Sequence, residues 1–557
     1  AAPALELVIL AVAGVALRTY ATGALPAGPL GLDDARLIRE FLGARIWHIF
    51  EYDHFGHLRP AKNLWFWWLA QDTHGIPVVR AFSVGASLVA AWGVRWLARA
   101  LGLSSGASTG AAIIWLLNPC TAAVTLWLAA SNYTFAVAGL LGYLWLMQRW
   151  REAAAWPCLL AAHAALLVSA LHHELAFLGP VLFALMRFAK PNPVPAQSLW
   201  RRWSFAILGL SLATLILALR SLSAQPALQY RMAERPAFGL FASSARYFFE
   251  NLGLWFWPQH TLGVLLEDPL PSKPVTNTLC WLALALVSFA LCRARSRDRV
   301  LVFGACWTFV CLAPIANFIP LGNTPVAVQY LALPGVGLAV LAARGLDALG
   351  HRFPRVRAWT ALLVSVAVVS LWQPAFRSGV RAFADTQALY ELTLANYPRN
   401  IQARANLSAL YLDQKAFAKA SALLDDSLRL APEDLALIGN RLEVYAALED
   451  FEGALRWLDQ HPHYVVAVPD ARVRRGIWLL RLGRHREAEE SFREVLRASS
   501  SARERYAAGY RLAIALVQQR KYSQAKQVLD AVVSEFPDEP DAKLAQQLVD
   551  DLLRDPG

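Results

Sequence analysis

The chain has 557 residues, of which 56% are hydrophobic, and it carries a formal net charge of +12. This apolar fraction is too high for an ordinary soluble protein, and the length allows several domains. Long apolar runs fill the sequence up to about residue 373, and beyond that point charged residues recur every few positions. We therefore predict an all-α protein with a polytopic membrane domain at residues 1–373 and a water-exposed domain at residues 374–557.

The membrane domain is predicted from apolar runs that are long enough to cross a bilayer, which takes about 20 residues in a helix. Eleven spans are expected, at residues 4–21, 77–98, 108–128, 132–148, 154–171, 173–189, 203–220, 277–292, 300–317, 326–346 and 357–373. The predicted architecture is thus a membrane helical bundle of about eleven spans.

The positive charges predict the orientation of these spans. Arginine recurs in alternate connections, for example at 149–151 and 293–299, whereas the connection at 318–325 has neither Lys nor Arg. The positive-inside rule places the arginine-rich connections in the cytoplasm. The long connections at 22–76 and 221–276, and the C-terminal domain, are then expected outside, in the periplasm if this is a bacterial inner-membrane protein. Because this topology accounts for most of the net charge, no nucleic-acid binding is expected.

Two adjacent carboxylates, Asp33 and Asp34, follow the first predicted span. Ionisable groups close to a bilayer are costly and are therefore functional candidates. One of these carboxylates could act as a general base for a membrane enzyme. The alternative is that the pair only caps a helix that starts at Ala35.

The C-terminal domain contains an internal repeat. Ala420, Ala454 and Ala488 are spaced by 34 residues, and Ala525 follows after 37. This period, with a small residue in the second helix of each unit, resembles tetratricopeptide repeats. About four repeats are predicted, preceded by one helix at 382–396. Such repeats stack into a solenoid with a concave surface, which implies a protein or peptide partner, although a purely stabilising cap remains an alternative.

The membrane domain carries short motifs in a recognisable order. They are Asp33-Asp34, Arg59-Pro60, Trp257-Pro258, Asn317-Phe318-Ile319-Pro320 and Tyr330-Leu331-Ala332-Leu333-Pro334. With the C-terminal repeats, this series resembles the transmembrane-and-TPR O-mannosyltransferases and their bacterial relatives. These are C-type glycosyltransferases that use lipid-linked sugars. The chain departs from the family at Asn118, Ala123 and Gln329, where the family has His, Glu and often a basic residue.

The resemblance implies a reaction. A sugar would pass from a polyprenyl-phosphate donor to an acceptor hydroxyl, expected to be a protein Ser or Thr, at the outer membrane face. The transfer would be a single displacement that inverts the anomeric carbon, with Asp33 or Asp34 as general base. The other carboxylate could orient an arginine or bind a divalent cation, and no further metal site is predicted.

The resemblance also implies roles for residues outside the acidic pair. Arg59 is the first candidate for the donor phosphate, because a guanidinium matches phosphate bidentately, and its alternative is snorkelling toward the headgroups. Arg220 and Arg246 are weaker candidates for the phosphate. The proposed sugar and acceptor pocket comprises His172, His173, Glu174 and Tyr330. For the His-His-Glu cluster a satisfied polar turn is an equal alternative.

Two other functions remain open from the sequence. One is a ligase or polymerase of lipid-diphosphate glycans, and the other is a non-catalytic membrane scaffold whose repeats assemble other proteins. The expected partners are a polyprenyl-phosphate-linked sugar, a protein or peptide acceptor bound by the repeats, and membrane lipids.

Overall fold

The structure is a computed structural model. It describes residues 37–51, 59–153, 155–189, 237–258, 274–295, 297–318, 326–353, 357–468, 470–498 and 502–536, with positions 544, 547 and 550. These residues form helices joined by turns and contain no β-strand, which confirms the all-α prediction for the described part of the chain. The chain divides into two compact units, residues 1–400 and residues 401–557.

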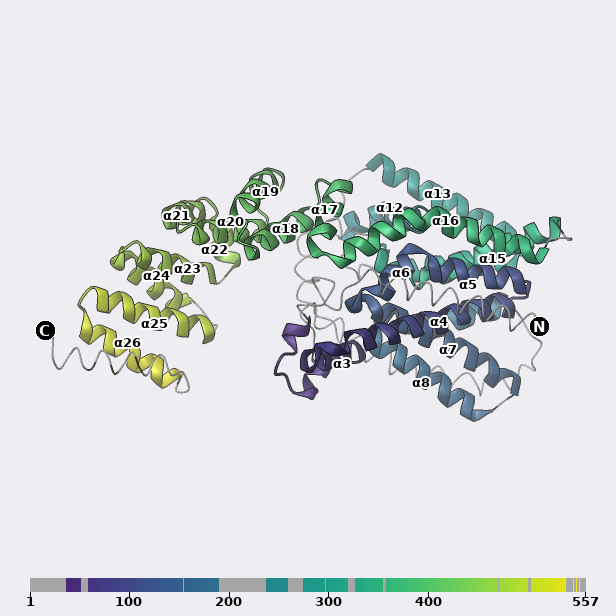
Figure 1. Ribbon diagram of the computed structural model, residues 1–557, viewed down its shortest axis with the longest axis horizontal. Coiled ribbons are helices and arrows are strands. Elements are labelled where there is room, and N and C mark those ends of the chain that lie inside the picture. The colour runs from purple at the N-terminus through teal and green to yellow at the C-terminus, as the bar shows by residue number, and fades with distance from the viewer. Residues whose placement is uncertain are drawn as a thin grey trace. The chain divides into compact units, whose positions relative to one another are not determined.

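The first half of the N-terminal unit is built around α4 (Ile76–Ala100). This helix packs between α5 (Ser105–Leu117) and α7 (Ser131–Ala153), and α7 packs in turn on α8 (Trp156–His172) (Figure 1). Gly93 allows the close approach of α4 to α7, because a Cβ atom there would lie 2.7 Å from the Cβ of Leu141. The contact between the two backbones therefore depends on a residue without a side chain.

The second half of the N-terminal unit contains α9 (Gly179–Ala189), α12 (Ala237–Phe256) and α13 (Pro274–Ala294). It also contains α14 (Arg299–Leu312), α15 (Pro334–Arg352), α16 (Arg357–Ala384) and α17 (Thr386–Asn396). Helices α15 and α16 both pack on α5, which joins this half to the first (Figure 1). Helix α16 continues through residue 373, and the unit ends at Asn400.

A sharp bend separates α5 from α6 (Pro119–Leu126), where a single apolar run at 108–128 predicted one span. The direction of the chain bends by 59° between the two helices. Asn118 lies at the break. Its side chain accepts a hydrogen bond from Cys120 N (2.9 Å) and donates one to the carbonyl of Trp255 (3.1 Å). Asn118 therefore caps α6 and ties the bend to α12, which explains an amide at this position.

Within the part of the chain that the structure describes, fewer helices have the length and hydropathy of a membrane span than the sequence predicted. Within the described residues, α4 and α13 are long and apolar enough, and α5 with α6 makes a third candidate if the bent pair counts as one span. The predicted spans at 4–21 and 203–220 lie outside the described residues. Helices occupy the other predicted positions, but several, such as α8 and α14, have fewer than 18 residues. The figure of eleven spans therefore stays a prediction.

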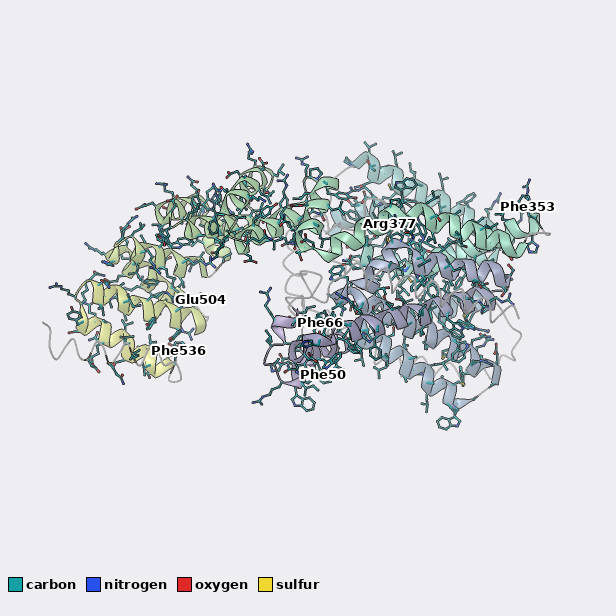
Figure 2. The ribbon with its side chains drawn as sticks, in the orientation of Figure 1. Phe50, Phe66, Phe353, Arg377, Glu504 and Phe536 are labelled. Atoms are coloured by element: carbon teal, nitrogen blue, oxygen red, sulfur yellow. The ribbon has the colours of Figure 1, made fainter. Side chains whose placement is uncertain are left out.

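A short helical layer precedes α4. It consists of η1 (Ile46–Phe50) and α3 (Pro60–Gln71), held together because Asn63 donates hydrogen bonds to the carbonyls of Ile49 (3.1 Å) and Glu51 (3.2 Å). Phe66 on α3 is buried, whereas Phe50 on η1 is exposed (Figure 2). One aromatic face thus closes a small core while the other faces outward.

The C-terminal unit consists of helix pairs. They are α18 (Ile401–Asp413) with α19 (Phe417–Leu430), α20 (Leu435–Ala447) with α21 (Phe451–Gln460), α23 (Asp470–Arg481) with α24 (His485–Ala498), and α25 (Ala502–Gln518) with α26 (Tyr522–Glu535). A short helix, α22 (Pro462–Ala467), lies between the second and third pairs. The periodic alanines at 420, 454, 488 and 525 are fully buried, one in each pair, which confirms the predicted repeat.

The turn inside each pair also repeats. Lys415, Glu449, Gly483 and Arg520 all have a positive φ, between 56° and 73°. Three of these positions are therefore non-glycine residues in the left-handed region, which normally favours glycine. The turn geometry follows the repeat even where the residue type does not.

Candidate functional site

A buried polar cluster joins segments that are far apart in the sequence. Arg59 comes from the start of α3, Tyr133 from the start of α7, His173 and Glu174 from the break after α8, and Tyr330 from η6 (Val328–Leu331). Each side chain stands at or next to the end of a helix, where the chain changes direction. The cluster thus lies where helix ends meet.

Arg59 holds Glu174 in a bidentate ion pair. Its Nε lies 3.0 Å from Oε2 and its Nη2 lies 2.6 Å from Oε1. The Arg59 side chain is 8% exposed and that of Glu174 is 32% exposed, so the cation is the more buried partner. Paired planar contacts of this kind fix orientation as well as charge. The guanidinium is locally neutralised by the carboxylate.

His173 is fixed by its neighbours on both sides. Its Nδ1 accepts a hydrogen bond from Leu175 N (3.1 Å), which caps η4 (Glu174–Leu178). Nε2 lies 3.2 Å from Nη2 of Arg59. Arg59 and His173 are therefore in direct polar contact, which links the ion pair to the histidine ring.

Tyr133 and Tyr330 form the aromatic side of the cluster. The Tyr133 ring lies 4.2 Å from the ring of His173 and 5.9 Å from that of Tyr330. The chain around Tyr330 is held by two buried indoles, since Trp115 donates to the carbonyl of Ala332 and Trp307 to that of Leu333, each at 2.9 Å. The position of Tyr330 is therefore set by the packing of α5 and α14.

Polar atoms beside the cluster lack partners among the described residues. The side chain of Asn132 donates to the carbonyl of His172 (3.3 Å), and its buried Oδ1 has no such partner. The ring of His172 stacks on Phe135 at 4.7 Å, and its Nδ1 is likewise buried with no described partner. These atoms are available to a ligand that carries hydroxyl groups.

Arg246 lies in a second polar cluster, between α12 and α13. Its Nε donates to Asn277 Oδ1 (3.0 Å), its Nη1 lies 3.5 Å from Glu250 Oε1, and its guanidinium stands 5.0 Å from the ring centre of Tyr247. Only 2% of the residue is exposed. These contacts make Arg246 a link between the two helices, and a role toward a donor phosphate stays a prediction.

The structure brings together four of the residues predicted from sequence: Arg59, His173, Glu174 and Tyr330. Asp33, Asp34 and Arg220 lie outside the described residues. Among the residues that are described, no group of three or more His, Cys, Asp or Glu side chains could hold a metal ion.

The sequence analysis did not identify Tyr133. Its signal was the polar run Ser131-Asn132-Tyr133 at the head of an otherwise apolar segment. A ring buried among His173 and Tyr330 could not be placed without the fold, because those contacts cross about 40 and about 200 residues of chain.

Comparison with known proteins establishes the class of the C-terminal unit. Residues 479–549 match the family model of the tetratricopeptide repeat. These residues are therefore tetratricopeptide repeats, a class of repeat that generally mediates protein–protein interaction. No curated protein matches the chain. Among solved structures, the crystal structure of the yeast Tom70 is similar at 14% identity, with a TM-score of 0.25, over 80% of this chain and 91% of that one.

Proposed function

We propose that this chain is a membrane glycosyltransferase that moves a sugar from a polyprenyl phosphate to an acceptor hydroxyl, with inversion at the anomeric carbon. The acceptor is a protein Ser or Thr presented at the outer face, where the repeat unit also lies. Asp33 or Asp34 takes the acceptor proton, and breakage of the bond to the phosphate releases the lipid phosphate.

One observation supports this proposal above the others. Arg59, Glu174 and Tyr330, each named by the family resemblance, contribute to a single buried polar cluster although they come from distant parts of the chain. A structural ion pair alone would not explain why the same cluster gathers two tyrosines and a histidine. The guanidinium of Arg59 matches a phosphate bidentately, which supports its assignment to the donor phosphate.

The test uses the full chain reconstituted in liposomes with a mannosyl polyprenyl phosphate and a Ser/Thr peptide. Replacing both Asp33→Asn and Asp34→Asn should abolish transfer, and Arg59→Lys should reduce it because a lysine cannot contact an anion bidentately. Asp72→Asn is the matched control, since Asp72 is a half-exposed carboxylate that contacts His74.

Unchanged transfer by the double aspartate variant would remove the catalytic assignment. No transfer by the unmodified chain, from either a monophosphate or a diphosphate donor, would favour the membrane scaffold. Transfer only from a diphosphate donor would favour the glycan ligase or polymerase.

A further inference from the structure

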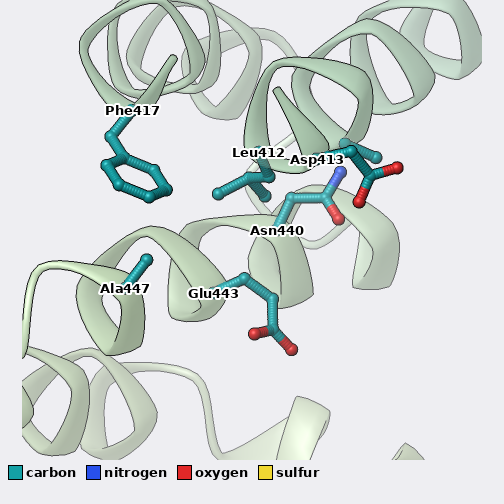
Figure 3. A pocket seen from close by; sticks show the side chains of 7 residues that line it. Leu412, Asp413, Phe417, Asn440, Glu443 and Ala447 are labelled. Atoms are coloured by element: carbon teal, nitrogen blue, oxygen red, sulfur yellow. The ribbon is translucent and has the colours of Figure 1, made fainter. Parts of the chain in front are cut away.

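A cavity of about 370 Å³ lies between the first two helix pairs of the C-terminal unit (Figure 3). It is lined by Ala409, Leu412, Asp413, Phe417, Asn440, Glu443 and Ala447. These residues come from α18, from the first residue of α19 and from α20. The cavity is therefore a feature of two adjacent repeats and belongs to neither alone.

Every polar group that lines the cavity presents a hydrogen-bond acceptor. Asn440 is fixed by its Nδ2, which donates to the carbonyl of Ala405 (2.7 Å) and to Ser408 Oγ (2.9 Å). Because the amide nitrogen is engaged there, the amide oxygen is the atom left for a ligand. The other two polar groups are the carboxylates of Asp413 and Glu443, which lie on either side of Asn440 (Figure 3).

The cations of the neighbouring helices do not remove this acceptor excess. Arg474 on α23 pairs with Glu443, and Lys419 on α19 stands over the ring of Tyr411 at 5.7 Å. The carboxylate of Asp413 has no hydrogen-bond or ion-pair partner among the residues that the structure describes. One carboxylate and one fixed amide oxygen thus face the cavity with their acceptor capacity available.

The rest of the lining is apolar. Leu412, Phe417, Ala409 and Ala447 surround the polar groups with aliphatic and aromatic surface. Long basic side chains combine an aliphatic stem with a terminal donor group, and they bury the stem along apolar surface. The cavity offers acceptors and apolar surface, so its ligand must supply hydrogen-bond donors and an apolar stem. A lysine or arginine side chain has both.

We propose that this cavity binds an arginine or lysine side chain of a partner protein. The cationic head lies between Asp413, Glu443 and the oxygen of Asn440, and the stem lies against Leu412 and Phe417. This rests on the proposed role of the C-terminal unit in presenting a protein acceptor. It adds that the segment recognised is basic.

The test is fluorescence anisotropy with the full chain in detergent and a labelled Ser-Ala-Ala-Arg-Ala-Ala-Ser peptide, in the absence of any sugar donor. The peptide with citrulline in place of arginine should bind about tenfold more weakly or worse, because citrulline keeps the shape and loses the charge. Asp413→Asn should weaken the arginine peptide by a similar factor and leave the citrulline peptide unchanged. Glu433→Gln removes an exposed carboxylate of the same repeat that does not line the cavity, and it should change neither.

A second variant, Ala447→Phe, fills the cavity from an exposed position on α20 and should abolish arginine-dependent binding even if Asp413→Asn has an unexpected effect on folding. Equal binding of the arginine and citrulline peptides, tighter binding of a glutamate peptide, or no binding at millimolar peptide would each overturn the proposal. Because no transfer is measured, a failure of the glycosyltransferase chemistry leaves the result unaffected. The double aspartate variant at 33 and 34 should bind the arginine peptide like the unmodified chain.

Discussion

Removing Arg59 and removing Glu174 should destabilise the protein by different amounts, although the two residues form one ion pair. The two partners are unequally buried, at 8% and 32% side-chain exposure. Glu174→Gln removes the carboxylate that contacts two nitrogens of a buried guanidinium, whereas Arg59→Gln leaves a carboxylate that still reaches solvent. Removing one partner of a buried pair costs about 3–5 kcal/mol, and exposed pairs are worth about 0–1 kcal/mol.

We therefore expect Glu174→Gln to lower the free energy of unfolding by about 3 kcal/mol and Arg59→Gln by about 1 kcal/mol. The double variant should cost less than the sum of the two, with a coupling of about 1 kcal/mol or more, because both residues share one network. Equilibrium unfolding in mixed detergent micelles, followed by tryptophan fluorescence, measures all three values.

The control for this cycle is Asp72→Asn, which alters a contact between half-exposed and exposed side chains and should leave the free energy of unfolding nearly unchanged. If Arg59→Gln costs as much as Glu174→Gln, the burial of the guanidinium does not govern the energetics. Strict additivity would mean that the bidentate contact contributes nothing.

Three further outcomes follow from the packing. Gly337→Ala should destabilise the N-terminal unit by about 1–3 kcal/mol in the same assay, because its Cβ would lie 2.5 Å from Thr308 Oγ1 and 2.6 Å from a backbone oxygen of α14; an unchanged midpoint would show that the helices separate freely. In the repeats, Gly483→Ala should lower the stability of its turn by about 1 kcal/mol, because the left-handed conformation disfavours a side chain. Glu449→Gly at the equivalent turn should be neutral or stabilising. Local hydrogen exchange measures both, and an equal loss of stability in the two variants would refute backbone strain as the cause. Burial raises the pKa of Glu489, but hydrogen bonds from Lys521, Gln519 and Arg493 outweigh it and hold that pKa below its ordinary value. The stability that these bonds confer is present above about pH 4.5 and is lost as the pH falls through the lowered pKa, so exchange protection around Glu489, corrected for intrinsic rates, should drop on acidification and Glu489→Gln should flatten the drop.

The sequence predicted the repeats more closely than the arrangement of the N-terminal unit. A 34-residue period needs only local regularity, and the buried alanines at 420, 454, 488 and 525 follow from it. The apolar runs of the N-terminal unit indicated helices but not their breaks. The bend at Asn118 and the end of α14 at Leu312 depend on capping and turn chemistry, such as the left-handed Asn317.

The sequence predicted several residues of the candidate site, but it did not predict which of them are in contact. Arg59 and Glu174 were each named for separate roles, toward the phosphate and toward the sugar, yet they form one ion pair across 115 positions. Such a contact depends on how helices pack, which a single sequence does not specify. Tyr133 was missed for the same reason.

The side chain of Asn440 spans two repeats, because it belongs to α20 and its amide holds the carbonyl of Ala405 on α18. In a solenoid each repeat touches only its neighbours, so curvature is the sum of small rotations at such joints. A rotation at this joint moves Glu443 relative to Asp413 and changes the width of the cavity between them. Bending of the solenoid at this joint would therefore change the width of the cavity, and a side chain held in the cavity would resist that bending.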